Sequence, residues 1–128
     1  MNKGAFKNAT RSWFVSKPLA LAAGGVAANL RHGLGGTPHL VRWVLVCLTS
    51  EGGYTPGDEV DIPAASTGYM EFASGANGTN VFLIMDKTGS GATNFAWVSK
   101  TDGTETTFTL SKWQAKCYAY RDSFIANP

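Results

Sequence analysis

Two histidines and a short acidic cluster are the residues best suited to hold a metal ion. His32 and His39 lie seven residues apart, with a Gly- and Pro-rich connection between them, and Asp58, Glu59 and Asp61 follow later in the chain. Imidazole nitrogens suit transition metals, and carboxylate oxygens suit harder cations. However, no third ligand stands at a recognised spacing from the histidines, and the acidic residues lack the spacing of a calcium-binding loop. We therefore expect no metal and no cofactor.

Residue types that could perform catalysis are present without a catalytic pattern. No serine lies in a G-x-S-x-G turn. Cys47 has apolar neighbours, which raise the pKa of a thiol and make it a poor nucleophile. Asp58 and Glu71 could form a carboxylate pair of the kind that hydrolyses glycosides, but no spacing supports the pairing. We expect no catalytic residue and do not expect an enzyme.

The two cysteines, Cys47 and Cys117, both stand in apolar runs typical of strands, and no C-x-x-C pair exists. This placement favours two buried free thiols. A disulfide, within one chain or between chains, remains the alternative.

The aromatic residues are the best candidates for contacts with a ligand or a partner, because aromatic rings stack on sugars and on proteins alike. Two tyrosines lie in or near expected loops, and two share the polar face of the last expected strand. These candidates are Tyr54, Tyr69, Tyr118 and Tyr120. Packing or a protein interface is the preferred interpretation for each.

Composition narrows the class of protein. The 128 residues predict one domain, with residues 1–11 as an N-terminal arm. Hydrophobic residues make up 44% and charged residues 16%, which excludes a disordered chain. The net charge is only +2 without a Lys/Arg cluster, so we expect no nucleic-acid partner. The longest apolar run, Trp43 to Leu48, is too short to cross a membrane, and no secretory signal is evident.

Short extended runs separated by Gly, Pro, Asn and Asp predict an all-β fold, a small antiparallel β-sandwich of six to eight strands. We expect turns at Ser74 to Gly78 and at Lys87 to Gly91, the second joining two strands that pair as a hairpin. The expected strands are Ser12–Leu21, Val26–Arg31, Leu40–Thr49, Glu59–Ile62, Asn80–Asp86, Ala92–Ser99, Thr106–Leu110 and Lys112–Arg121, and Thr67–Ala73 is a further candidate.

Two of these strands, Leu40–Thr49 and Asn80–Asp86, are apolar on both faces, whereas a sandwich normally covers only one face of each strand. The second face therefore needs cover, either from the N-terminal part of the chain or from another copy. We favour another copy. The residues expected to mediate self-association are Arg42, Val44, Val46, Leu48, Phe82 and Ile84.

The segment HGLGGTPHLVRWVLVCLTSEGGYTPGDEV, His32 to Val60, resembles a run in small domains of bacteriophage tail-fibre and other virion structural proteins. The order of the later strands, NVFLIM, NFAWVS and KWQAKCYAY, is similar to that of H-type-lectin-like sandwiches. The resemblance implies an antiparallel sandwich that tends to form trimers. The residues Gly33, Gly35, Gly36 and Pro38 are expected to serve backbone geometry.

These observations lead to one hypothesis of function and one alternative. The first is a bacteriophage virion structural protein, in the tail, neck, fibre or capsid decoration. It would self-assemble, as a trimer, dock on other virion proteins and reside in the virion after assembly in the host cytoplasm. The alternative is a lectin-like carbohydrate-binding module that recognises a host surface glycan. Neither hypothesis involves insertion into a membrane.

Overall fold

The computed structural model describes residues 12–21, 25–62, 72–85 and 94–122. These residues form an all-β fold with one short 3-10 helix, η1. The elements are β1 (Trp13–Val15), β2 (Leu19–Ala20), β3 (Gly25–Arg31), β4 (Leu40–Cys47), β5 (Glu59–Asp61), β6 (Phe72–Ala76), β7 (Asn80–Met85), β8 (Asn94–Val98), β9 (Glu105–Thr109), η1 (Leu110–Lys112) and β10 (Trp113–Tyr120).

The larger layer, sheet A, is built around β10. Its strand order is β1-β10-β4-β5, and β2 also pairs with β10. Every pairing is antiparallel, and β10 lies against β4 over its whole length without a register shift, from Trp113 opposite Cys47 to Tyr120 opposite Leu40. The last described strand of the chain is therefore a central strand of this sheet.

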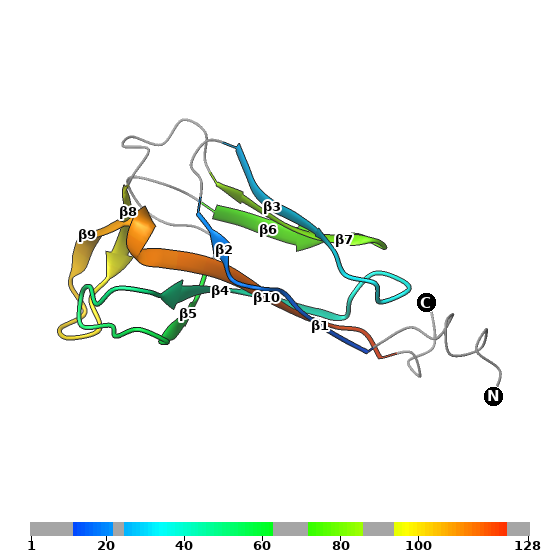
Figure 1. The fold of residues 1–128 in the computed structure, drawn as a ribbon, viewed down its shortest axis with the longest axis horizontal. Helices are drawn as coiled ribbons and strands as arrows, with labels where there is room; N and C mark the ends of the chain where they lie inside the picture. The colour runs from blue at the N-terminus through cyan, green and yellow to red at the C-terminus, as the bar shows by residue number, and fades with distance from the viewer. Residues whose placement is uncertain (1–11, 22–24, 63–71, 86–93, 123–128) are drawn as a thin grey trace.

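The second layer, sheet B, has the order β3-β7-β6, and β8 and β9 form a separate two-stranded hairpin. Figure 1 shows sheets A and B stacked as two layers, with the β8–β9 hairpin at one end of the molecule. The sequence prediction of a small antiparallel sandwich is therefore confirmed.

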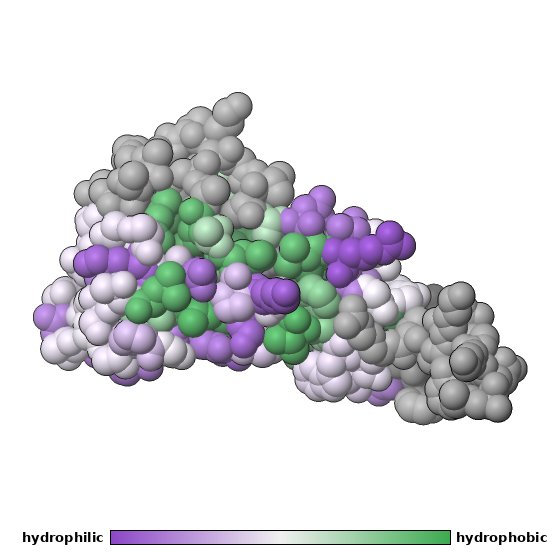
Figure 2. All heavy atoms as spheres, in the orientation of Figure 1, coloured by the Kyte–Doolittle hydropathy of each residue, from purple (hydrophilic) through white to green (hydrophobic). Residues whose placement is uncertain are grey.

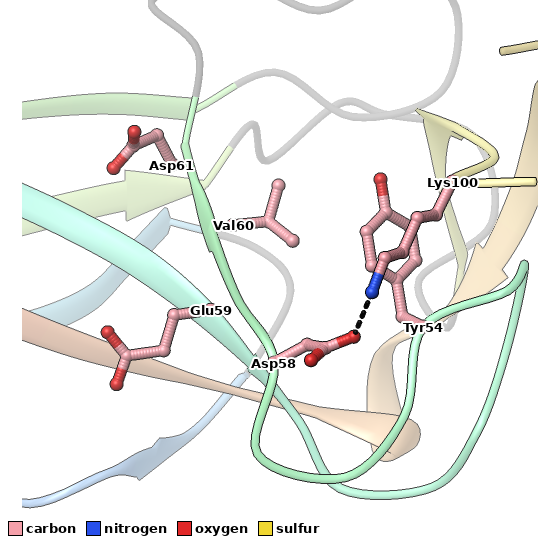
Figure 3. Close-up of a pocket in the computed structure, with 6 residues that line it drawn as sticks. All are labelled: Tyr54, Asp58, Glu59, Val60, Asp61 and Lys100. Atoms are coloured by element: carbon pink, nitrogen blue, oxygen red, sulfur yellow. Dashed lines mark hydrogen bonds and ion pairs between the residues drawn. The ribbon is translucent and has the colours of Figure 1, made fainter.

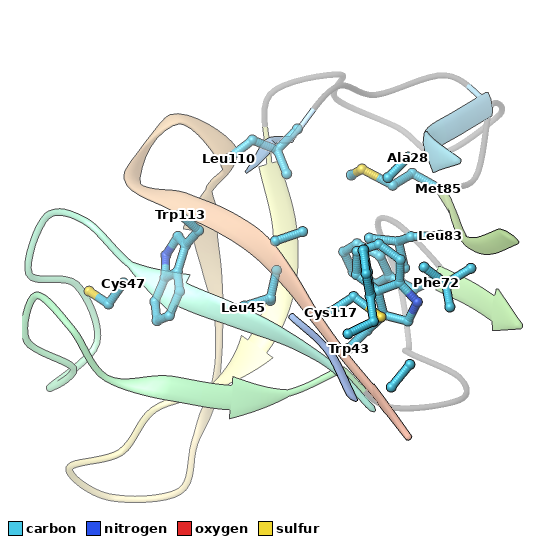
Figure 4. Close-up of a cluster of buried hydrophobic side chains, with 14 of the residues drawn as sticks. Ala28, Trp43, Leu45, Cys47, Phe72, Leu83, Met85, Leu110, Trp113 and Cys117 are labelled. Carbon is cyan, nitrogen blue, oxygen red and sulfur yellow. The ribbon is translucent and has the colours of Figure 1, made fainter. Parts of the chain in front are cut away.

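The core lies between the two layers, as alternation along the strands requires. On β10, the inward positions Trp113, Ala115, Cys117 and Ala119 are all buried. Leu45 of β4 belongs to the same core cluster (Figure 4). The facing positions on β7 are fully buried as well: Val81, Leu83 and Met85. Each large apolar side chain removed from water stabilises the fold by about 1.5–3 kcal/mol.

The His32–Gly36 connection is held by a buried histidine. His32 is fully buried, its Nδ1 accepts a hydrogen bond from the Leu34 N–H at 3.0 Å, and its Nε2 lies 2.9 Å from the Asn77 carbonyl oxygen. The ring is therefore neutral, with its proton on Nε2 donated to Asn77. Gly33 and Gly35 take positive φ angles of 69° and 80°, which residues with a Cβ rarely adopt. The expected role of these two glycines in backbone geometry is confirmed.

Three details of the sequence prediction are wrong. The stretch Ser12–Leu21 is divided into β1 and β2 around Pro18, so the strand count rises to ten in the described part of the chain. Residues Ser74–Ala76 belong to β6, because Asn77 makes the turn by accepting hydrogen bonds from the N–H groups of Thr79 and Asn80.

The third error concerns pairing. Strands Asn80–Asp86 and Ala92–Ser99 were expected to form one hairpin, but β7 pairs with β3 and β6, while β8 pairs with β9. The residues expected to join them, Lys87 to Gly91, lie outside the described residues. The 101–104 turn connects β8 to β9 instead, with Asp102 accepting hydrogen bonds from Thr104.

Candidate functional site

The outer face of sheet A carries most of the residues that the sequence singled out. Directly opposed residues on neighbouring strands form rows across this face. Trp13, Tyr120 and Leu40 make the first row, and Val15, Tyr118 and Arg42 make the second. Figure 2 views the two layers from the side and shows hydrophobic side chains in separate patches, with hydrophilic groups between them.

The centre of the outer face is a polar network. The Tyr118 hydroxyl lies 2.9 Å from both carboxylate oxygens of Glu59, and Lys116 Nζ lies 3.7 Å from the same carboxylate. Lys116 Nζ also lies 4.9 Å from the Tyr118 ring centroid. The hydrogen bond with Tyr118, and then the charge of Glu59, raise the pKa of Lys116. Beside them, the hydrogen bond to Asp61 raises the pKa of Arg42.

Val44 was expected to mediate self-association, and its burial beside this network contradicts that prediction. The Val44 side chain is fully buried within the single chain, with Lys116 opposite it on β10 and Asp61 opposite it on β5. Long charged side chains can cover apolar surface with their methylene stems while their charged ends stay in water. Val44 is therefore unavailable for contact with a second copy in this fold.

The other expected self-association residues differ in exposure. Arg42 is exposed, Val46 is half-buried, and Leu48 and Ile84 are exposed at 43% and 37%. Phe82 of β7 is half-buried, because its ring lies over Gly75 of β6: a Cβ at Gly75 would stand 2.8 Å from Phe82 Cζ. The six residues are thus not one patch. Four lie on or just after β4, and two lie on sheet B.

The most exposed apolar residues gather at one end of the outer face, which we call the terminal patch and define as Trp13, Val15, Leu40 and Tyr120. Trp13 and Leu40 are each 56% exposed and Val15 is 52% exposed. Tyr120 stands between Trp13 and Leu40, with its ring centroid 4.5 Å from that of Trp13. Only Tyr120 of this patch was a candidate from sequence, because β1 was not recognised as the neighbour of the last strand.

The acidic cluster is divided among separate partners. Asp58 Oδ2 accepts from the Thr55 N–H and from Lys100 Nζ, both at 3.0 Å. These bonds, the backbone one first, lower the pKa of Asp58. An open pocket of about 370 Å³ is lined by Tyr54, Val60 and the Asp58–Lys100 pair among others (Figure 3). The figure shows Glu59 and Asp61 pointing away from Asp58, so the three carboxylates do not converge on one point.

Tyr54 is chiefly a packing residue. Its ring makes edge contacts with Phe108 at 5.8 Å and with Trp113 at 5.4 Å between centroids, and its hydroxyl donates to the Val98 carbonyl at 2.8 Å. Tyr69 lies outside the described residues. Of the four tyrosine candidates, the structure brings Tyr118 and Tyr120 together on the outer face of sheet A and places Tyr54 beside the β8–β9 hairpin.

The two histidines serve separate structural roles. His32 holds its loop as described above, and His39 Nδ1 accepts from the Asp122 N–H at 2.9 Å. Within residues 12–21, 25–62, 72–85 and 94–122, no three His, Cys, Asp or Glu side chains are grouped to hold a metal ion.

Both thiols are free and buried. Burial raises the pKa of Cys117 to about 12. For Cys47, burial and then the charges of Asp58 and Glu51 raise the pKa. A thiol must lose its proton to act as a nucleophile, so neither cysteine is suited to thiol chemistry.

The best-connected side chain in this region, Glu51, was missed by sequence reasoning. Its Oε1 accepts from the Thr109 N–H at 2.9 Å and from Trp113 Nε1 at 3.0 Å, and its Oε2 accepts from the Thr109 hydroxyl at 3.1 Å. Lys112 Nζ lies 3.5 Å from the same carboxylate, whose side chain is only 13% exposed. In the sequence, Glu51 is a single glutamate before two glycines in a loop, and nothing in that pattern predicts these hydrogen bonds.

Comparison of the chain with protein-family models, with curated proteins and with solved structures found no match. In the described ranges, no helix has the length and apolar character needed to span a membrane.

Proposed function

We propose that the chain is a structural protein of a bacteriophage particle, which self-associates as a trimer and docks on other virion proteins. The observation that carries the proposal is the terminal patch, where three apolar side chains are more than half exposed on one sheet face. The resemblance of His32 to Val60 to virion proteins supports the choice of particle, and the similarity of the later strand order to H-type-lectin-like sandwiches supports the choice of a trimer.

The composition of the face supports an interface between proteins. The centre of such interfaces is enriched in aromatic residues, and charged residues form their rim. Trp13 and Tyr120 are adjacent in the terminal patch, and Arg42 and Asp61 lie beside it in the next rows. Covering half-exposed apolar side chains stabilises an assembly by about 1 kcal/mol or more for each one.

Two leucines at opposite ends of β4 provide a matched test. Leu40 is 56% exposed in the terminal patch, and Leu48 is 43% exposed just beyond the opposite end of β4. Sedimentation of the native chain at micromolar concentration should give a mass three times 13.6 kDa. Leu40→Ser should weaken assembly, whereas Leu48→Ser should leave it intact, with unchanged circular dichroism in both.

The possible results separate the parts of the proposal. A native chain that stays monomeric at these concentrations contradicts self-association. Dissociation by Leu48→Ser alone moves the interface to the other end of β4 and refutes the terminal patch.

A further inference from the structure

The outer edge of β5 leaves backbone hydrogen-bonding groups without strand partners. In sheet A, β5 stands at the end of the strand order and pairs with β4 alone. The Asp58 carbonyl accepts a hydrogen bond from β4, and the Ile62 N–H donates one to β4. Successive residues of an antiparallel strand point their N–H and C=O groups to opposite sides. Those of Glu59 and Asp61 therefore point away from β4, where no strand of residues 12–21, 25–62, 72–85 or 94–122 pairs with them.

The side chains of β5 alternate between the two faces of the sheet. Glu59 and Asp61 lie on the outer face, among the polar side chains described above. Val60 packs against the core and, together with Tyr54, lines the open pocket of about 370 Å³. Figure 3 shows Val60 directed toward Tyr54, and Glu59 and Asp61 directed the opposite way. A strand added at this edge would thus meet an acidic, an apolar and an acidic residue in turn.

This alternation selects the residues of an added strand. Residues directly opposite each other in an antiparallel pair carry their side chains on the same face, and opposite charges there are favourable. Basic residues opposite Glu59 and Asp61 would lie on the outer face, with an apolar residue between them beside Val60. The Asp61 side chain is 67% exposed, and Arg42 contacts only its Oδ1 atom, so Oδ2 can accept from a basic side chain. The edge therefore favours the pattern basic–apolar–basic.

This chain does not itself contain that pattern. None of its eleven Lys and Arg residues stands two positions from another. Pairing of β5 with β5 of a second copy would place carboxylates opposite carboxylates, which is destabilising. Short, charged edge strands of this kind resist pairing with their own copies. The strand that fits this edge must come from a different protein.

We propose that the outer edge of β5 binds an extended segment of another protein with the pattern basic–apolar–basic, as an additional antiparallel strand of sheet A. Backbone hydrogen bonds to Glu59 and Asp61 provide the affinity, and the alternating side chains provide the preference for sequence. Every strand pair of sheet A is antiparallel, which sets the direction. The site is separate from the terminal patch, because β5 and β1 stand at opposite ends of the strand order.

The test uses the full chain labelled with nitrogen-15 and the blocked peptide acetyl-TTKVKTT-amide, added to about 10 mM so that millimolar binding is detected by NMR. The peptide should shift the amide resonances of Glu59 and Asp61 and slow their hydrogen exchange, because both N–H groups acquire acceptors. The charge-reversed peptide acetyl-TTEVETT-amide should bind about tenfold more weakly, because like charges then face each other.

Backbone methylation of the peptide separates strand pairing from simple attraction of charge. In the antiparallel register, the N–H groups of the two lysines face β5 and the valine N–H faces away. Methylating both lysine backbone nitrogens should abolish binding, whereas methylating the valine nitrogen should preserve it. All three peptides carry the same charge.

Two nearby acids provide matched variants of the chain. Asp61→Asn should weaken binding of the lysine peptide by about two- to fivefold, because one cross-strand ion pair is lost. Asp58→Asn should leave the affinity unchanged, because that carboxylate is bonded to Lys100 and points away from the outer face.

Three results would overturn the proposal. The first is a lysine peptide that leaves the Glu59 and Asp61 resonances unmoved. The second is a peptide with methylated lysine nitrogens that binds as well as the one with a methylated valine nitrogen. The third is movement of the same resonances on dilution of the chain without peptide, which would assign the edge to a second copy. Peptide binding is measured separately from the mass of the assembly, so it can fail or succeed independently of the proposed trimer.

Discussion

Removing the Glu51 carboxylate should destabilise the fold more than removing any exposed acid. Glu51→Ala leaves the Thr109 N–H and the Trp113 Nε1–H without their acceptor, and Trp113 is only 2% exposed. An unpaired buried donor costs about 1–3 kcal/mol. Because Glu51 is 13% exposed, water can enter part of the space, so we expect a total loss of about 3 kcal/mol.

Glu51→Gln distinguishes hydrogen bonding from charge. The amide oxygen can still accept from Thr109 and Trp113, and the amide nitrogen can donate to the Thr109 hydroxyl. Only the contact with Lys112 is lost, so this variant should cost about 1 kcal/mol or less. Glu59→Ala serves as the control, since its partners Tyr118 and Lys116 lie on the outer face and exposed ion pairs contribute less than about 1 kcal/mol.

The assay is chemical denaturation followed by tryptophan fluorescence, with thermal melting alongside. A loss of about 3 kcal/mol corresponds to a fall in melting temperature of about 10 °C for a domain of this size. If Glu51→Ala is no less stable than Glu59→Ala, the hydrogen bonds of Glu51 do not contribute to stability and the reasoning is refuted.

Two further predictions concern buried groups. His32→Leu should lower the free energy of unfolding by about 3 kcal/mol, because the Leu34 N–H and the Asn77 carbonyl lose their partner. The control, His39→Leu, should lower it by less than about 1 kcal/mol. Equal losses of stability for the two variants in chemical denaturation would contradict the assigned role of His32. The pKa of Cys117 is raised to about 12 in the folded state, whereas the thiol pKa in the unfolded chain is about 8.5. The stability that the protonated thiol contributes is therefore complete below the unfolded pKa and is lost as pH rises toward the folded pKa. Denaturation at pH 8 and pH 10 should therefore show a larger loss for the native chain than for Cys117→Ala, and identical losses would exclude the thiol as the cause.

The alternation of apolar residues predicted the core better than it predicted the surface. On β10, the inward set Trp113, Ala115, Cys117 and Ala119 follows directly from a period of two. On β4 the same rule placed Val44 outward, yet Val44 is fully buried, with Asp61 of β5 and Lys116 of β10 directly opposite it. Which long polar residue shields an apolar one depends on strand register, which a single sequence does not specify.

Because a single sequence does not specify strand register, it also predicted only part of the candidate functional site. The positive φ angles of Gly33 and Gly35 were foreseeable, since glycine is the residue that tolerates them. The terminal patch was not, because it joins Trp13 to Leu40 and Tyr120 across long intervals of chain.

The position of β10 has a consequence for synthesis. β1, β2 and β4 all pair with this strand, and β1 and β2 have no other strand neighbour in the described sheets. During translation, β1, β2 and β4 cannot pair with β10 to form sheet A until residues 113–120 have left the ribosome. Until then β4 is unpaired along the edge that β10 will occupy, so the nascent chain exposes an apolar strand to aggregation for longer than a protein of local hairpins would.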